Sequence, residues 1–312
     1  MNDKRVYAFG HVSTGRIHRI EGSFPEANGY GEVQETLKNY SGEATGTSLV
    51  LQRLGIQTTL EGNWIGDNPQ GKETLDFLTG RGIDTSGLHI QEGYEGVNEI
   101  VITDGKTRTV FGRYIDLLFT TPQWEAPSEE AIQKASLVSI DASFGSTADQ
   151  VGRLAQKHNI PFVSIDAPYD SWLTQNAQVM ILSEEFLKRV YKDELEQDKL
   201  EELFVHYLEN CPGWVVFTFG ENPLWFAKKN PLFKQEFKPF QIDPLDTAGA
   251  GDSFRGGLLY GMLQEGWSFA ESIRFAAGVA AMVCLSTPGA CDSPSVSEVE
   301  EFLSLYDFIN KD

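Results

Sequence analysis

The hydrophobic residues of the chain are arranged in two ways, and segments of the two kinds alternate along the sequence. Apolar runs of about four to eight residues are typical of buried strands, whereas apolar residues spaced three and four apart are typical of helices that cover a sheet. The strand-type runs are 6–9, 58–65, 137–140, 162–165, 179–182 and 214–219; the helix-type segments are 46–54, 71–78, 147–158, 199–208, 252–263 and 269–285. This alternation predicts an α/β fold with a doubly wound, mostly parallel sheet in a three-layer αβα sandwich.

Two stretches, 12–40 and 96–119, interrupt this alternation. The second contains a hairpin signal: 98–103 and 107–114 are strand-like, and Asp104-Gly105 stands between them as the turn. Two independent surface hairpins would explain both stretches, and so would one small β-sheet that covers a cleft as a lid. The lid interpretation predicts an α/β core of 1–11, 41–95 and 120–312, with 12–40 and 96–119 forming the lid.

Helix starts near the C-terminus carry clear capping signals. Ser268 and Glu271 have the spacing of a capping box, which predicts a helix that runs to about Leu285. Ser295 and Glu298 repeat the pattern and predict the last helix. The helix after Ser268 contains a run of small residues around Gly278, which permits close packing.

The charge of the chain limits its partners. The 312 residues include 45 Asp and Glu against 25 Lys and Arg, a formal net charge of −20. Such a surface disfavours non-specific binding to nucleic acid and to anionic membranes. No stretch reaches 18 apolar residues, so we expect a soluble, cytoplasmic protein. The three cysteines include no CxxC pair, which supports neither a disulfide framework nor a zinc site.

One segment carries the chemistry. Asp246-Thr-Ala-Gly249-Ala-Gly251-Asp252 is followed directly by an amphipathic helix. Free amides at a helix start, together with the helix dipole, favour an anion such as a phosphate. A carboxylate beside that site matches the needs of phosphoryl transfer, where amides stabilise charge on the transferred group and a base accepts the hydroxyl proton. Asp252 as a simple helix cap after a Gly-rich turn is the alternative interpretation.

Other nucleotide-binding motifs are missing from the sequence. There is no Walker A motif, and no GxGxxG follows a predicted strand. The sequence therefore gives no support to a P-loop enzyme or to a dinucleotide-binding domain. If the chain binds ATP, backbone amides, helix N-termini and metal ions must supply most of the positive field.

The segment 246–252 resembles the C-terminal signature of the ribokinase-like, or PfkB-type, carbohydrate kinases. Four further landmarks in the family's order extend the resemblance over almost the whole chain. They are Trp64-Ile-Gly-Asp-Asn-Pro-Gln-Gly71, the following segment Gly82-Ile-Asp-Thr-Ser, the strand and turn Val215 to Glu221, and Asp166 to Trp172, which is similar to a stretch common in fructokinases. The resemblance implies the doubly wound core with a small β-sheet lid, which is frequently a dimer interface.

The resemblance also implies roles for individual residues. Asp252 would be the base, and the amides of Gly249, Ala250 and Gly251 would form the anion hole. The nucleotide side would be lined by Thr218, Gly220, Glu221, Thr247 and Gly278, and the sugar side by Gly42, Gly46, Asp141 and Asp252. A monovalent cation, K⁺, would be held at positions 246, 248, 289 and 293, which here are Asp246, Ala248, Gly289 and Ser293.

Three departures from the family pattern affect the substrate and the metal. The family's sugar-binding Asn is replaced by Gly46, and an Asp near the N-terminus is replaced by Gly15. A pocket that loses partners for hydroxyl groups loses discrimination. Lid residues such as Asn98, Arg108 and Arg113 are candidates to compensate. The motif that places Mg²⁺ is altered to Ser183-Glu-Glu-Phe186, where Glu184 or Glu185 would reach the metal through water or serve only as first-turn helix acids.

These observations predict an ATP- and Mg²⁺-dependent sugar kinase that forms a homodimer through its lid. Fructose going to fructose 6-phosphate is the specific substrate prediction, from the similarity at Asp166 to Trp172. Ribokinase, nucleoside kinase and 2-keto-3-deoxygluconate kinase are the alternatives within the class. A catalytically silent relative that binds a metabolite and acts as a regulator is the alternative from a different class.

Overall fold

The computed structural model describes residues 4–309 except 106, 116, 118–120, 193–196 and 230–233. The chain forms two compact units, each built from separate stretches of sequence. Unit 1 contains Met1–Gly10 and Ala126–Gln241, and unit 2 contains His11–Glu125 and Ile242–Asp312.

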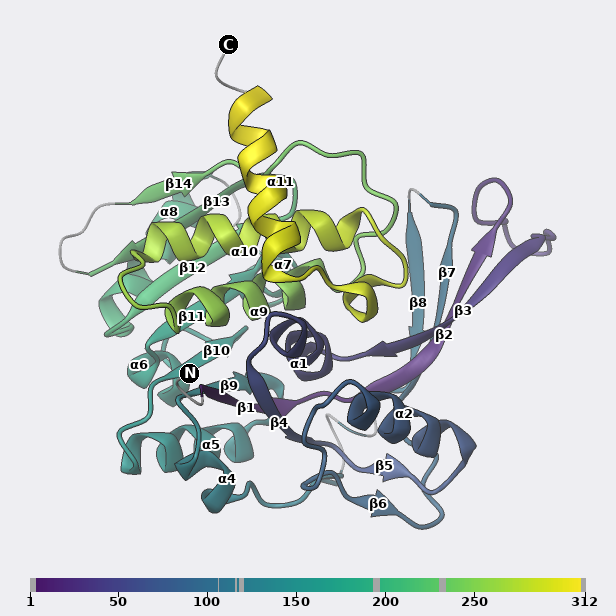
Figure 1. The fold of residues 1–312 in the computed structure, drawn as a ribbon, viewed down its shortest axis with the longest axis horizontal. Helices are drawn as coiled ribbons and strands as arrows, with labels where there is room; N and C mark the ends of the chain where they lie inside the picture. The colour runs from purple at the N-terminus through teal and green to yellow at the C-terminus, as the bar shows by residue number, and fades with distance from the viewer. Residues whose placement is uncertain are drawn as a thin grey trace. The chain divides into compact units, whose positions relative to one another are not determined.

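Unit 1 is built on a mostly parallel sheet (Figure 1). Its strands run in the order β14-β13-β12-β11-β10-β9-β1. The five strands β12, β11, β10, β9 and β1 run parallel to one another. Beyond β12, β13 and β14 are added with antiparallel pairing. Their bounds are β1 Arg5–Gly10, β9 Leu137–Asp141, β10 Phe162–Ile165, β11 Val179–Ser183, β12 Trp214–Phe219, β13 Asn222–Lys228 and β14 Gln235–Phe237. The parallel strands are apolar along their length because such strands are covered on both faces.

Helices connect the parallel strands of unit 1. They are α4 Glu129–Gln133, η1 Ala142–Phe144, α5 Ser146–Lys157, α6 Trp172–Asn176, α7 Glu184–Val190 and α8 Gln197–Asn210. In α5 the buried residues Ala148, Val151 and Ala155 are spaced three and four apart and form one face. That face explains why α5 contacts β9.

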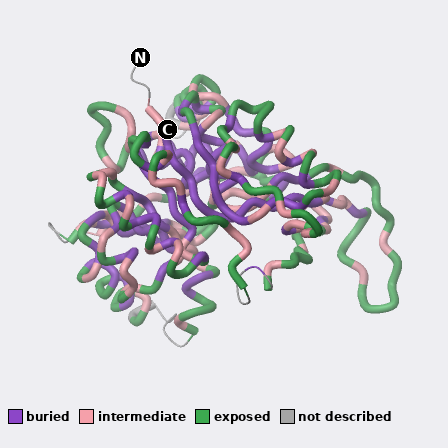
Figure 2. The backbone as a smooth tube through the Cα atoms, turned by 90° about the horizontal axis from the view of Figure 1, so that it is seen from below, coloured by how far each residue is buried: buried purple, intermediate pink, exposed green. Residues whose placement is uncertain are grey.

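Unit 2 contains a four-stranded sheet in the order β3-β2-β7-β8, which we call the small sheet. Its strands are β2 Ser13–Ile20, β3 Val33–Ser41, β7 Asn98–Thr103 and β8 Arg108–Gly112. The predicted hairpin is present as β7 and β8, although β8 ends at Gly112 rather than at Tyr114. The connection between β2 and β3 is almost entirely exposed (Figure 2).

The rest of unit 2 is mainly helical. It contains α1 Glu43–Arg53, β4 Gln57–Gly62, β5 Ile65–Gly66, α2 Pro69–Gly80, β6 Ile90–Gln91, α9 Ala250–Met262, α10 Phe269–Cys284, η2 Gly289–Asp292 and α11 Val296–Ile309. Helices α9 and α10 lie side by side (Figure 1), and α1 also packs on α9. The backbones of α9 and α10 approach closely because Gly257 leaves space: a Cβ there would lie 2.8 Å from Ala276 Cα.

The predicted fold class is confirmed, and the differences lie at element ends and in short elements. Helix α1 begins three residues before the predicted start, and α9 begins at Ala250 instead of Asp252. The predicted strand 58–65 ends at Gly62. The capping box between Ser268 and Glu271 is present in both directions. The prediction did not include β13, β14, α4, α6 or α7, because short segments carry little periodicity.

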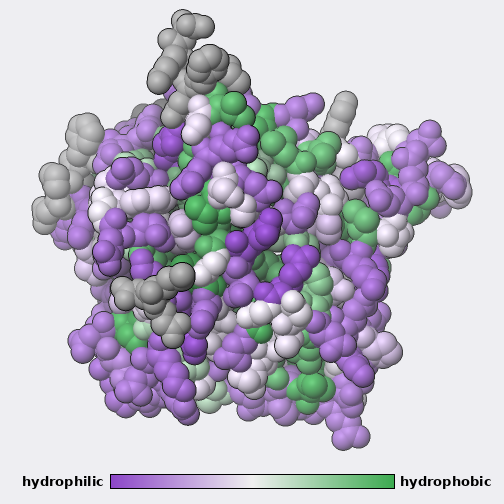
Figure 3. Space-filling view, in the orientation of Figure 1, coloured by the Kyte–Doolittle hydropathy of each residue, from purple (hydrophilic) through white to green (hydrophobic). Residues whose placement is uncertain are grey.

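The surface agrees with the acidic composition. Hydrophilic residues cover most of the face seen in Figure 3. Among the described helices, none combines the length and the apolar character needed to cross a membrane.

Candidate active site

The first turn of α9 contains the predicted base. Gly249 is the N-cap, in the left-handed region with φ 75°, and the helix begins at Ala250. Asp252 is therefore the third residue of the helix. The interpretation of Asp252 as the helix cap is wrong, because Gly249 occupies that position and no side chain caps the helix. The left-handed conformation explains why glycine stands at 249.

The amides around this turn are only partly used. Ala250 N donates to Thr247 O at 3.3 Å, and Ser253 N donates to Gly249 O at 2.9 Å. Within the described residues, the amides of Gly249 and Gly251 donate to no other backbone group. Unused amides at a helix start carry a partial positive charge that suits an anion. Of the three predicted anion-hole amides, that of Ala250 is thus the one already engaged within the chain.

Two buried polar residues hold this turn against α1, and the sequence analysis missed both. Arg255 Nε donates to Thr47 Oγ1 at 2.7 Å, and the Thr47 hydroxyl donates to the backbone oxygen of Asp252 at 3.2 Å. Arg255 is only 1% exposed. One sequence feature could have identified Arg255: it is a cationic residue on the apolar face of a predicted helix. Buried Arg is rare unless it is paired.

The N-terminus of α1 contributes a charged pair. Gly42 is its N-cap with φ 105°, and Glu43, the first helical residue, is hydrogen-bonded to His11; the two form an ion pair when the imidazole is protonated. Burial raises the pKa of the Glu43 carboxyl, but the charge and hydrogen bond of His11 and the charge of Arg255 outweigh it and lower that pKa to about 2. Glu43 is consequently ionised at neutral pH. One turn further along α1, Gly46 faces Asp252.

Asp141 lies in unit 1 at the carboxyl end of β9. It is 1% exposed, and its side chain lies against the end of the neighbouring strand β1. A Cβ on Gly10 would come within 1.7 Å of Asp141 Oδ2, so the glycine at the end of β1 makes room for this carboxylate. The predicted strand 6–9 stopped one residue before Gly10, which is the last residue of β1.

The predicted nucleotide residues of unit 1 cluster at the end of β12. Thr218 Oγ1 donates to Leu182 O at 3.3 Å, and Gly220 forms the turn into β13 with φ 61°. Glu221 is exposed in that turn. A register shift between Phe217 and Phe219 interrupts the pairing with β13 and frees this end of the strand for other contacts.

The predicted magnesium residues are in the first turn of α7. Ser183 caps the helix, and Glu184 pairs with Lys188 at 2.7 Å. Glu185 is exposed. This geometry gives Glu184 the ordinary role of a first-turn helix acid, and it leaves Glu185 as the more accessible carboxylate for a hydrated metal ion.

Three of the four positions predicted for a monovalent cation, Asp246, Ala248 and Gly289, lie together in unit 2. Asp246 Oδ1 accepts from Ala248 N at 2.8 Å, whereas Asp246 Oδ2 is buried and has no hydrogen-bond partner among the described residues. Gly289 closely approaches Ala248, since a Cβ there would lie 2.8 Å from Ala248 O. Ser293, just after η2, is buried. A buried carboxylate oxygen without a partner beside backbone carbonyls fits a cation site.

The remaining nucleotide candidates of unit 2 have different surroundings. Thr247 is exposed and precedes the α9 cap. Gly278 is buried in α10, and a Cβ there would lie 2.9 Å from Leu303 Cδ2 of α11. Packing between α10 and α11 accounts for the glycine at 278, so its small size gives no independent sign of a ligand.

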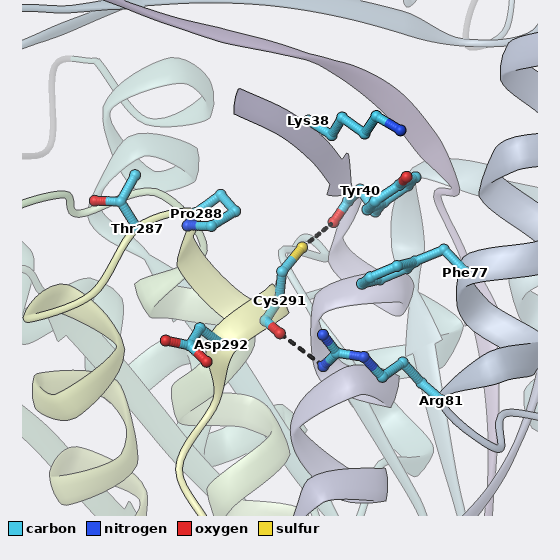
Figure 4. A pocket seen from close by; sticks show the side chains of 8 residues that line it. All are labelled: Lys38, Tyr40, Phe77, Arg81, Thr287, Pro288, Cys291 and Asp292. Atoms are coloured by element: carbon cyan, nitrogen blue, oxygen red, sulfur yellow. Dashed lines mark hydrogen bonds between the residues drawn. The ribbon is translucent and has the colours of Figure 1, made fainter. Parts of the chain in front are cut away.

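A hollow of about 360 Å³ lies elsewhere in unit 2 (Figure 4). One wall is the stacked pair Tyr40 and Phe77, with ring centroids 3.9 Å apart. Arg81 crosses it and donates from Nη1 to Cys291 O at 2.8 Å. The hollow borders η2, but none of the predicted catalytic residues lines it.

The predicted site residues divide between the two units. Unit 2 holds Gly42, Gly46, Asp246, Thr247, Ala248, Gly249, Ala250, Gly251, Asp252, Gly278, Gly289 and Ser293, and unit 1 holds Asp141, Glu184, Glu185, Thr218, Gly220 and Glu221. Within unit 2 the structure brings the base, the free amides and the N-terminus of α1 together.

Comparison with known proteins identifies the family. The pfkB family carbohydrate kinases match residues 3–295. An ATP-dependent ribose-1-phosphate kinase of Halopiger xanaduensis is 25% identical over 96% of this chain and 98% of that protein. A ribokinase of Bacillus subtilis is 26% identical over 84% of this chain and 87% of its own length. The structure of Arabidopsis thaliana ribokinase complexed with ribose and ATP superposes with a TM-score of 0.80 at 16% identity, covering 96% and 98% of the two chains.

The chain therefore belongs to the pfkB family of carbohydrate kinases, and the resemblance seen in the sequence is confirmed. Its family is thus that of kinases that act on carbohydrates.

Proposed function

We propose that this pfkB family kinase transfers the γ-phosphoryl group of ATP to a hydroxyl group of a small sugar, with Asp252 as the base. The observation that carries the proposal is the first turn of α9, where the Asp252 carboxylate and the unused amides of Gly249 and Gly251 belong to one helix start. Gly249, Ala250 and Gly251 supply the anion hole.

The proposed reaction is a direct displacement at phosphorus. The Asp252 carboxylate accepts the proton of the sugar hydroxyl, the hydroxyl oxygen forms a bond to the γ-phosphorus, and the bond to the β,γ-bridging oxygen breaks, releasing ADP. Amides at the start of α9 stabilise the negative charge on the transferred group. The hydrogen bonds from Arg255 through Thr47 keep the turn in place.

On the nucleotide side we infer that Thr218, Gly220 and Glu221 are the contacting residues of unit 1. In unit 2 the candidates are Thr247 and the α10 backbone around Gly278. Mg²⁺ accompanies ATP as the counter-ion of its phosphates, and Glu185 would hold it through water, while Glu184 stays paired with Lys188. Asp246, Ala248, Gly289 and Ser293 would hold K⁺, and the partnerless buried oxygen of Asp246 supports this assignment. We infer a cytoplasmic location from the proposed use of ATP and a free sugar as substrates.

The sugar itself is a separate proposal. Gly42 and Gly46 would line the pocket with Asp252, all three within unit 2. Fructose remains the prediction from the similarity at Asp166 to Trp172, where Asp166 accepts hydrogen bonds from the amide and hydroxyl of Ser183. That geometry gives the segment a structural role in unit 1 and adds no support for fructose. Ribose is the second candidate, because the names of the relatives refer to ribose and ribose 1-phosphate.

We also infer a homodimer formed through the small sheet. Ile100 of β7 and Phe111 of β8 are directly paired, so they share one face of the sheet, and they are 50% and 52% exposed. Large apolar side chains exposed as neighbours are typical of an interface. Light scattering should give a dimer that Ile100→Asp converts to a monomer; a monomeric wild-type protein would contradict the inference.

A substrate panel tests the proposed reaction. Release of ADP should be measured with Mg-ATP and fructose, ribose, a nucleoside or 2-keto-3-deoxygluconate, each with and without K⁺. We expect turnover on at least one neutral sugar and a higher rate with K⁺. Turnover on none of them would reject the kinase proposal and favour a metabolite-binding regulator.

A further inference from the structure

Gly15 stands where the family pattern has an acidic residue, and the structure closes this position to any side chain. Gly15 of β2 pairs with Glu99 of β7. A Cβ at Gly15 would lie 2.3 Å from Glu99 O and 3.0 Å from Glu99 Cβ. Because the obstacle includes backbone of a paired strand, a larger residue would require the two strands to separate.

Gly46, where the family pattern has Asn, is closed in the same way. A Cβ at this position would lie 2.8 Å from Asp252 Cβ and 3.1 Å from Asp252 Oδ2. Helix α1 therefore packs directly against the proposed base. Any hydroxyl-binding groups on this side must come from neighbouring positions.

Glu99 provides a carboxylate beside the first closed position. It accepts hydrogen bonds from Ser13 Oγ at 3.1 Å and Ser41 Oγ at 2.8 Å, and from Asn39 Nδ2 at 3.4 Å. These donors come from β2 and β3 and fix the direction of the carboxylate. Each carboxylate oxygen can accept more than one hydrogen bond, so Glu99 retains capacity for a ligand hydroxyl.

Glu43 provides a second carboxylate close to Asp252. Ser41, which binds Glu99, is separated from Glu43 only by Gly42, the N-cap of α1. The charge of Glu43 helps to raise the pKa of Glu99, after burial, which is the larger cause. The Glu43 side chain is 44% exposed although it pairs with His11. Glu99 thus accepts a hydrogen bond from the residue before Gly42, and Glu43 follows Gly42 directly. Gly46, which faces Asp252 of α9, lies one turn further along α1.

We propose that Glu99 and Glu43 are the specificity-determining residues of the sugar site and that they replace the side chains missing at Gly15 and Gly46. They accept hydrogen bonds from sugar hydroxyls and select an uncharged sugar over sugar acids and sugar phosphates. This inference rests on the proposed function of Asp252.

The physical reason for the selection is charge. Carboxylates are strong acceptors for hydroxyl groups. The proposed sugar site would then include three acidic groups, Glu99, Glu43 and Asp252, and a carboxylate or phosphate on the substrate would be repelled at short range. The inference therefore separates the candidate substrates: ribose and fructose should bind, whereas 2-keto-3-deoxygluconate and ribose 1-phosphate should be rejected.

Direct binding and turnover of these four compounds test the inference. Calorimetry without ATP should detect ribose or fructose with the wild-type protein and detect neither charged compound. Glu99→Gln and Glu43→Gln should each weaken binding of the neutral sugar and raise its KM about tenfold, the value of one hydrogen bond to a charged group. The KM for ATP should stay unchanged. Glu99→Asp, which keeps the charge, should retain the preference for neutral sugars.

A matched control uses Glu95, an exposed residue that pairs with Arg113. Glu95→Gln should behave as the wild type. Equal sugar affinity in Glu99→Gln, Glu43→Gln and Glu95→Gln, with thermal unfolding showing all three folded, would overturn the inference even with normal turnover. Tighter binding of either charged compound by the wild type would also overturn it. Glu99-dependent binding of a neutral sugar without any turnover would support the inference and reject the kinase proposal instead.

Discussion

The phosphate side and the sugar side of unit 2 are built in different ways. The phosphate side lies within seven consecutive residues, Asp246 to Asp252, and a single helix start sets its geometry. The sugar side draws on separate segments: Ser41 and Glu99, which bind each other, are 58 residues apart. A contiguous site is recognisable in the sequence, whereas an assembled site depends on which strands pair. The two sides meet where Gly46 of α1 faces Asp252.

The largest expected effect comes from the contiguous side. Asp252→Asn removes the proposed proton acceptor and keeps the size of the side chain, so kcat should fall by about 10²- to 10⁴-fold with little change in KM for ATP. Steady-state kinetics on the sugar found in the panel measures this. Asp292→Asn, on η2, is the control and should retain activity. Near-normal kcat in Asp252→Asn would remove Asp252 from the role of base.

The junction between the two sides should be the next most sensitive position. Gly46→Ala introduces a Cβ too close to Asp252, and a displaced base should lower kcat about 10- to 100-fold. Gly80→Ala is the matched control, because Gly80 is also helical and no atom would contact its Cβ within 4 Å. Equal kcat values for the two variants would show that the packing of α1 does not position the base.

The buried hydrogen bonds behind the site should give a moderate effect. Thr47→Val removes the acceptor of Arg255 Nε, and leaving this buried donor unpaired should lower the free energy of unfolding by about 1–3 kcal/mol. Thr47→Ser keeps the hydroxyl and should restore most of the loss. Urea unfolding measures stability, and kcat measured in parallel reports on Asp252. Equal free energies of unfolding in Thr47→Val and Thr47→Ser would show that the hydroxyl of Thr47 does not contribute to stability.

The smallest effect should be a dependence of stability on pH. The pKa of Glu43 is lowered to about 2 in the folded protein. Its ion pair with His11 therefore contributes fully above the ordinary Glu pKa as long as the imidazole is protonated. This contribution should be lost as pH falls from about 4.5 towards 2. The free energy of unfolding should be measured across this pH range. It should decrease less steeply with falling pH in Glu43→Gln than in the wild type. An identical slope in both proteins would contradict the lowered pKa.

Sequence patterns predicted the long elements and failed at short ones for physical reasons. Buried strands such as β10 and β12 were predicted with their observed ends because their apolar runs stop abruptly. The antiparallel strands β13 and β14 were missed, since β13 is exposed at its start and β14 is only three residues long and not buried. The start of α9 was placed two residues late because glycine and alanine carry no pattern, although Ala250 is already helical.

For the candidate site, the sequence alone determined the segment 246–252, its glycines and the acidic residue that follows them. Local chemistry sets this part: a left-handed glycine before a helix leaves amides free wherever the helix is placed. Only the tertiary structure decided that Gly15 and Gly46 are closed, that Thr47 and Arg255 support Asp252, and that Glu99 accepts a hydrogen bond from the residue before Gly42. These contacts depend on strand register and helix packing, which no local pattern in one sequence specifies.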